Sequence, residues 1–111
     1  MNTSMAIKLY CLLSTLEAKH NLLWTDGLHR KILMAVLDAH RNGLRYSTYQ
    51  IVDLDFTSRS STYRKISDLK ISGFLSEIWD ENTCYLTLGP SSIAMIADAD
   101  IMVKNFSAKT D

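Results

Sequence analysis

Basic and hydroxyl-bearing side chains are concentrated between residues 58 and 65, inside the segment LDFTSRSSTYRKISDLKISGFL. At helical spacing Thr62, Ile66 and Leu69 share one side of this segment, and its polar side chains lie mostly on the other. Arginine can read guanine through two hydrogen bonds, whereas hydroxyls and lysine more often hold phosphates. The candidate DNA contacts here are Ser58, Arg59, Ser60, Ser61, Tyr63, Arg64 and Lys65. The alternative is an ordinary solvated helix face, and the choice depends on the surrounding elements.

The two arginines of this segment cannot both point at base edges. Arg59 lies in the first turn of the expected helix, and helical geometry rotates Arg64 about 140° away from it. The first turn of such a helix usually points into the groove. We therefore predict that Arg59 contacts bases and that Arg64 contacts a flanking phosphate.

The sequence between two later strand-like runs is acidic, because it begins with Asp80 and Glu81. Phosphate repels such a tip, so we expect this loop to be mainly structural. Asn82 and Thr83 could still make neutral contacts with DNA.

Residue types that support metal binding or catalysis are scattered. His20, His29 and His40 have no compact ligand spacing, and Cys11 and Cys84 are too isolated to indicate a metal site or a disulfide scaffold. We interpret Cys11 as a buried small hydrophobic residue without a regulatory role. No set of nucleophile, base and oxyanion donors is recognisable, so we expect neither an enzyme nor a cofactor.

The 111 residues fit one domain, and 47% of them are hydrophobic. Twelve basic residues balance twelve acidic ones, which argues against a nonspecific nucleic-acid coat but allows a local basic patch. No apolar run is long enough to span a membrane. The apolar start carries only Lys8 and no clean cleavage site, so we interpret it as a helix of a cytoplasmic protein.

Periodicity and turn signals predict a mainly α chain with one small β-hairpin. Ser47 and Gln50 match a capping box, with Ile51 and Leu54 as the buried positions of the short helix that follows. The expected elements are helices at about 4–20 and 28–41 (the second capped by Thr25 or Asp26), a short helix from Ser47, a helix from Thr57 or Ser58 to Gly73, strands at 74–79 and 84–88, and a last helix at about 91–106 capped by Ser91 or Ser92.

Two consecutive short helices followed by a hairpin form a winged helix-turn-helix. Residues 54–75 resemble the recognition half of the multiple-antibiotic-resistance regulator (MarR) family, in which a Ser/Thr/Arg-rich helix closes with a leucine, three residues, glycine and two apolar residues. Here these are Leu69, Gly73 and Phe74-Leu75, and YLTLGPSSIAMI resembles the end of the wing and the start of the last helix. The short acidic wing departs from the family pattern, as does the short chain.

The resemblance implies a single domain over residues 1–111 that binds double-stranded DNA and regulates transcription. Surplus apolar residues in the terminal helices, at about 4–20 and 91–106, predict that these helices form a homodimer on a pseudo-palindromic operator. A single intramolecular core is the alternative use of these residues. Two other functions stay open: a winged-helix module that binds protein, and a sensor whose unknown small-molecule effector sits between the core and the dimer helices.

Overall fold

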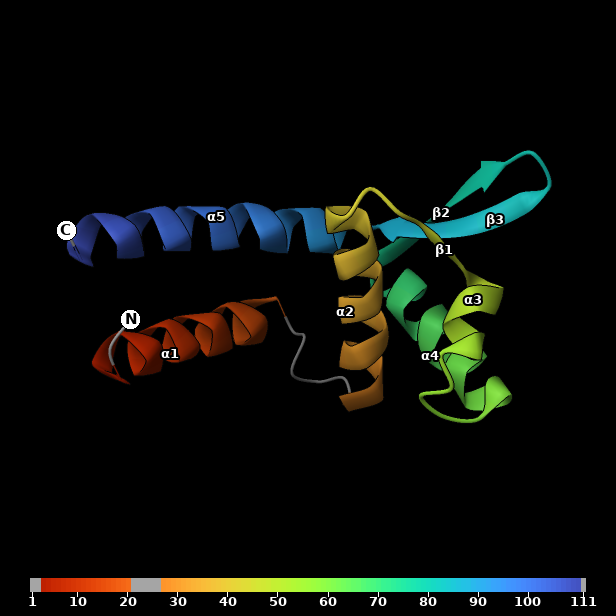
Figure 1. The fold of residues 1–111 in the computed structure, drawn as a ribbon, viewed down its shortest axis with the longest axis horizontal. Helices are drawn as coiled ribbons and strands as arrows, with labels where there is room; N and C mark the ends of the chain where they lie inside the picture. The colour runs from red at the N-terminus through yellow and green to blue at the C-terminus, as the bar shows by residue number, and fades with distance from the viewer. Residues whose placement is uncertain (1–2, 21–26, 111) are drawn as a thin grey trace. The chain divides into compact units, whose positions relative to one another are not determined.

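The computed structural model describes residues 3–20 and 27–110, and the chain divides into two compact units. The core unit comprises residues 25–93, and the terminal unit comprises residues 1–24 and 94–111. The predicted caps Thr25 and Asp26 lie outside the described residues. The elements are α1 (Thr3–Lys19), α2 (Gly27–Arg41), β1 (Tyr46–Ser47), α3 (Thr48–Asp53), α4 (Arg59–Ile71), β2 (Leu75–Asp80), β3 (Thr83–Leu88) and α5 (Pro90–Thr110) (Figure 1).

The core unit packs α2, α3 and α4 with an antiparallel sheet of strand order β1-β3-β2. The predicted hairpin is confirmed, with Leu75 opposite Leu88 and Asp80 opposite Thr83. The sequence did not predict β1, because two residues are too few to show a period. The buried apolar side chains of this unit include Ile32, Leu33, Val36, Ile51, Ile66, Leu69, Phe74, Leu75 and Leu86. The predicted mainly α fold class with a small β-hairpin is therefore confirmed.

The capping box at the start of α3 is confirmed. The Gln50 backbone N–H donates to Ser47 Oγ at 3.2 Å, and the Ser47 backbone N–H donates to Gln50 Oε1 at 2.8 Å. The predicted burial of Leu54 is wrong. Leu54 is exposed because α3 ends at Asp53, and Asp55 then adopts a left-handed backbone (φ 61°) that turns the chain toward α4.

The end of α4 is joined tightly to the start of α5. Gly73 has a φ of 83°, which suits glycine, and a Cβ on Gly89 would lie only 2.1 Å from the Gly73 carbonyl oxygen. Ser91 and Ser92 are not the caps that the sequence predicts, because α5 begins at Pro90. Their hydroxyls instead donate to the carbonyls of Ser72 and Phe74, at 2.9 and 2.6 Å. These bonds hold the connection between α4 and β2, so they fix where the hairpin begins.

In the terminal unit, a carboxylate on α5 connects α1 to α5. Asp98 Oδ2 lies 2.8 Å from both Lys19 Nζ and His20 Nε2. Hydrogen bonds from Lys19 and His20 hold the pKa of Asp98 below its usual value. The helix α5 runs on to Thr110, so its predicted end near Phe106 is about one turn too early. Neither glycine nor proline follows Pro90 to stop the helix.

Replacing Asp98 with asparagine should lower the melting temperature by a few degrees at neutral pH. The folded-state pKa lies below the usual value near 4, so the charged form stabilises the fold above that pH. This contribution is lost as the pH falls through the folded-state pKa. The matched control is Asp100→Asn, because the ion pair of Asp100 with Lys104 lies within α5. Thermal unfolding of both variants is followed by circular dichroism at neutral and acid pH. If Asp98→Asn melts at the same temperature as wild type at neutral pH, the contribution assigned to Asp98 is contradicted.

Candidate nucleic-acid interface

The candidate DNA-contacting segment forms the start of α4, and Ser58 caps it. Ser58 Oγ accepts a hydrogen bond from the Ser61 backbone N–H at 3.3 Å, while its carbonyl accepts one from Thr62 Oγ1 at 2.9 Å. Thr62, Ile66 and Leu69 are buried, as the helical spacing predicts. The buried face fixes the rotation of α4 and thereby determines which side chains point outward.

The exposed face of α4 carries polar residues over most of its length. Ser60, Arg64 and Ser67 follow one another at helical spacing on the side opposite the buried residues, and all three are exposed. Arg59 and Tyr63, also exposed, lie on one flank of this stripe, and the half-buried Ser61 and Lys65 lie on the other. The helical candidates thus extend around the whole solvent-facing side of α4, with Arg59 and Lys65 on opposite flanks.

Arg59 is held against the neighbouring helix. Its guanidinium carbon lies 5.6 Å from the ring centroid of Tyr49, within the range of a cation–π contact. Tyr49 belongs to α3 and is 57% exposed. Reasoning from sequence missed Tyr49, because its position beside Arg59 depends on how α3 packs against α4. The signal available in the sequence was the position of Tyr49 between Ser47 and Gln50, the two residues of the capping box.

A buried histidine fixes α4 to α2. His29 Nε2 lies 2.8 Å from Asp68 Oδ2, and His29 is buried. Asp68 is the one acidic residue of α4, beside four basic ones: Arg59, Arg64, Lys65 and Lys70. The contact directs the only acidic side chain of α4 toward α2.

The hairpin is fixed to the rest of the core unit by two ion pairs. Lys70 of α4 pairs with Glu77 of β2, and Arg45 Nη2 lies 2.8 Å from Asp80 Oδ2. The Arg45 guanidinium also lies 4.3 Å from the Tyr85 ring centroid. The acidic character of the tip is therefore partly compensated at Asp80.

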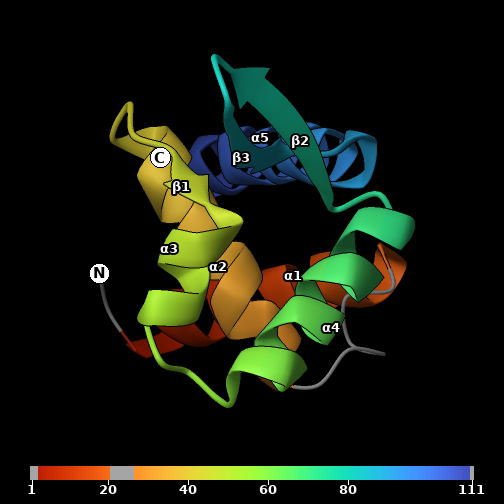
Figure 2. The same ribbon diagram turned by 90° about the vertical axis from the view of Figure 1, so that its right-hand side faces the viewer.

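The turn itself consists of Glu81 and Asn82, and Glu81 has a left-handed backbone with φ of 55°. Asn82 and Thr83 are exposed. Figure 2 shows α3 and α4 facing the viewer, with β2 and β3 above them. The hairpin that carries these neutral wing candidates belongs to the same unit as α4.

The cysteines and histidines form no metal centre among the described residues. Cys11 is exposed in the single chain, so its predicted burial is wrong: it lies on the outer side of α1, away from the buried Leu16. Burial raises the pKa of the Cys84 thiol, and a hydrogen bond with Glu77 adds to this effect. The described helices include none that is long and apolar enough to cross a membrane.

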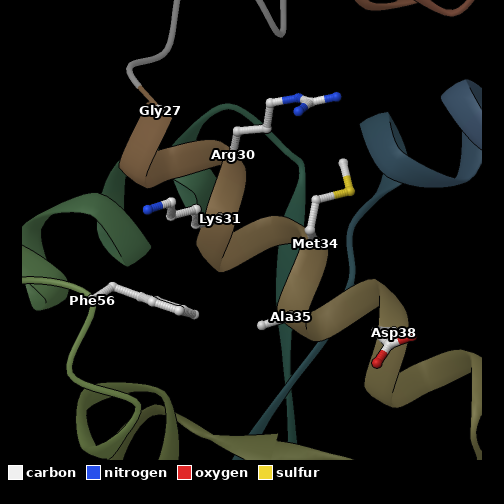
Figure 3. A pocket seen from close by; sticks show the side chains of 7 residues that line it. All are labelled: Gly27, Arg30, Lys31, Met34, Ala35, Asp38 and Phe56. Carbon is white, nitrogen blue, oxygen red and sulfur yellow. The ribbon is translucent and has the colours of Figure 1, made fainter.

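A hollow of about 650 Å³ lies between α2 and the turn that precedes α4. Met34, Ala35 and Phe56 provide apolar surface, and Lys31 and Asp38 add charged groups (Figure 3). The Phe56 ring points toward α2. Because Phe56 lies in the turn between α3 and α4, the hollow adjoins the segment that sets the position of α4.

No family model matches the sequence, and no curated protein matches it either. Solved structures do match. A homodimeric winged helix-turn-helix DNA-binding domain from Mycobacterium bovis, a possible ArsR-family transcriptional regulator, is 12% identical with a TM-score of 0.55, over 92% of this chain and 90% of that one. The chain has the winged helix-turn-helix fold. In this fold α3 and α4 are the helix-turn-helix, and β2 and β3 are the wing.

Two further winged-helix matches extend over nearly the whole chain. The transcriptional regulator BldR from Sulfolobus solfataricus is 14% identical with a TM-score of 0.54, over 99% of this chain and 85% of that one. The heme sensor protein PefR from Streptococcus agalactiae, solved with heme, is 13% identical with a TM-score of 0.56, over 95% of this chain and 72% of that one. These structural matches establish the shared fold. Their sequence identities are too low to establish a family, so membership of the MarR family stays a prediction.

Proposed function

We propose that the chain is a MarR-like transcriptional regulator that binds a specific pseudo-palindromic site in double-stranded DNA as a homodimer. The observation that carries this proposal is the exposed stripe of Ser60, Arg64 and Ser67 on α4, flanked by Arg59 and Tyr63. In helix-turn-helix proteins the second helix enters the major groove, where arginine and hydroxyl groups reach bases and phosphates. The winged helix-turn-helix order makes α4 that helix.

Local charge supports the same proposal. The whole chain has no net formal charge, yet α4 carries four basic residues and one acidic residue. A protein that concentrates its positive charge on one helix can bind phosphates there without coating DNA nonspecifically. The Arg45–Asp80 ion pair reduces the repulsion that the acidic wing would otherwise exert.

The geometry leads us to reverse the roles that the sequence suggested for the two arginines. Arg64 lies in the stripe directly opposite the buried face, the side of α4 that can enter a groove. Arg59 lies on the flank and stacks over Tyr49, which suits a contact with the phosphate backbone beside the groove. We propose that Arg64 reads a base and that Arg59 holds a phosphate.

The homodimer is supported by apolar side chains left exposed in α1 and α5. On α1 these are Ile7, Tyr10 and Leu13; on α5 they are Ile93, Ile96, Ile101 and Val103. Such surfaces on a small protein tend to be covered by a partner, and a twofold dimer is the commonest arrangement. The homodimeric Mycobacterium bovis domain has the same fold. We propose that α1 and α5 form the dimer, which places two copies of α4 on one duplex.

Selection of bound sequences from a random duplex library tests this function. We expect enrichment of two inverted half-sites whose centres lie about 10 base pairs apart, one helical turn. Binding that selects no sequence would overturn the specific regulator. A protein that binds no duplex at low salt would instead favour a winged-helix module that binds protein.

A further inference from the structure

The wing carries a tryptophan in an unusually open position. Trp79 lies on β2 opposite Cys84, next to the last residue of the strand, and it is 67% exposed. Ile71, the last residue of α4, is 84% exposed. Large apolar side chains left in water at the ends of two connected elements suggest a surface that a partner covers.

The strand register assigns Trp79 to the face of the wing that is joined to α4. Side chains alternate along a strand, so Leu75, Glu77 and Trp79 share one face. Leu75 is buried in the core, and Glu77 pairs with Lys70 of α4. Trp79 therefore lies on the same face of the hairpin as Glu77, the residue that pairs with the proposed DNA-reading helix, but nearer the tip of the wing.

Two carboxylates near Trp79 are paired with basic side chains, and Glu81 in the turn adds a third, exposed acidic group. Lys70 neutralises Glu77, and hydrogen bonds from Lys70 and Cys84 hold the pKa of Glu77 below its usual value. Asp80 projects from the opposite face, where Arg45 holds it at 2.8 Å. The pairing of Glu77 and Asp80 reduces the repulsion that a phosphate backbone near the Trp79 ring would meet.

Resting on the proposed function, we propose that Trp79 is a DNA-contacting residue of the wing. Its ring packs on deoxyribose in the strand beside the groove that α4 enters, and its indole N–H donates to a phosphate oxygen. Continuity with the α4 surface through the Lys70–Glu77 pair favours duplex DNA as the occupant. The wing thus contributes affinity through apolar contact and one neutral hydrogen bond, and releases no counterions.

The test uses the 111-residue chain with Trp24→Phe, which leaves Trp79 as its only tryptophan. Labelled duplex of the selected sequence should quench or shift the Trp79 emission in parallel with the rise in DNA anisotropy. In the otherwise wild-type protein, Trp79→Ala should weaken duplex binding about tenfold, typical of losing one aromatic contact. The slope of affinity against salt concentration should stay unchanged. Ile78→Ala, an exposed neighbour on the opposite face of the same strand, is the matched control and should bind as wild type.

Each other outcome has one meaning. Unchanged Trp79 emission in a protein that binds the duplex overturns this inference and leaves the proposed function intact. If the Trp79 emission changes with protein concentration in the absence of DNA, Trp79 lies in a contact between protein molecules. That result also overturns the inference that Trp79 contacts DNA. Failure of the wild type to bind any duplex at low salt is a failure of the proposed function itself.

Discussion

Replacing Arg64 with alanine should weaken binding to the selected duplex by about 1–3 kcal/mol and relax the preference at one base position of each half-site. Arg64 lies in the middle of the exposed stripe of α4, opposite the buried Thr62, Ile66 and Leu69. A guanidinium there can form two hydrogen bonds to a guanine, and alanine can form none. Repeated site selection with the variant measures the lost preference directly.

Arg59→Ala is the matched comparison, because it removes the same group from the same helix. We expect it to weaken binding on all sequences alike and to reduce the salt slope by about one unit. Both variants should melt like wild type, since both side chains are exposed. If Arg59→Ala alone relaxes the base preference, the roles of the two arginines are those that the sequence first suggested. If neither variant changes binding, α4 is not the reading helix.

Placing glutamates at Ile96 and Val103 together should convert the dimer to a monomer. The two residues lie seven apart on one side of α5, and both are exposed in the single chain. Burying their carboxylates in an apolar interface is costly, so the dimer dissociation constant should rise by at least about a hundredfold. Sedimentation equilibrium measures this constant. Affinity for the two-half-site duplex should fall with it, because each monomer holds only one half-site.

The control for the dimer variant is Asn105→Glu, which adds a negative charge at an exposed polar position of α5. It should leave the dissociation constant near that of wild type. A wild-type protein that stays monomeric at high micromolar concentration would refute the terminal-helix dimer. If the Ile96→Glu/Val103→Glu variant dimerises as the wild type does, the dimer interface must lie on another surface of the protein.

Local signals in the sequence were sufficient to predict the order of the helices and the hairpin, and the rotation of α4, but not β1. Ser47 and Gln50 have the three-residue spacing of a capping box before a helical run. The spacing of Thr62, Ile66 and Leu69 alone predicts the buried face of α4. The sequence also placed the start of α4 at Thr57 or Ser58, and Ser58 is the residue that caps it. The acidic tip of the wing was also predicted from the sequence, because Asp80 and Glu81 lie between the two strands.

What the sequence could not predict depends on contacts between distant segments. Tyr49 meets Arg59 only because α3 packs against α4, and Arg45 compensates Asp80 across 35 positions of the chain. Ser92 resembles a helix cap in sequence, yet in the fold its hydroxyl binds the Phe74 carbonyl. Periodicity likewise overstated the apolar side of α1, which led to the wrong burial of Cys11.

The central claim is that α4 binds duplex DNA through its exposed cationic face. The most direct measurement is the anisotropy of a labelled duplex carrying the selected half-sites, titrated with wild-type protein over a series of salt concentrations. We predict saturable binding that weakens linearly on a log–log plot, together with a clear preference for the selected duplex over a scrambled one at every salt concentration. No binding at low salt, or equal binding to both duplexes, would contradict the account.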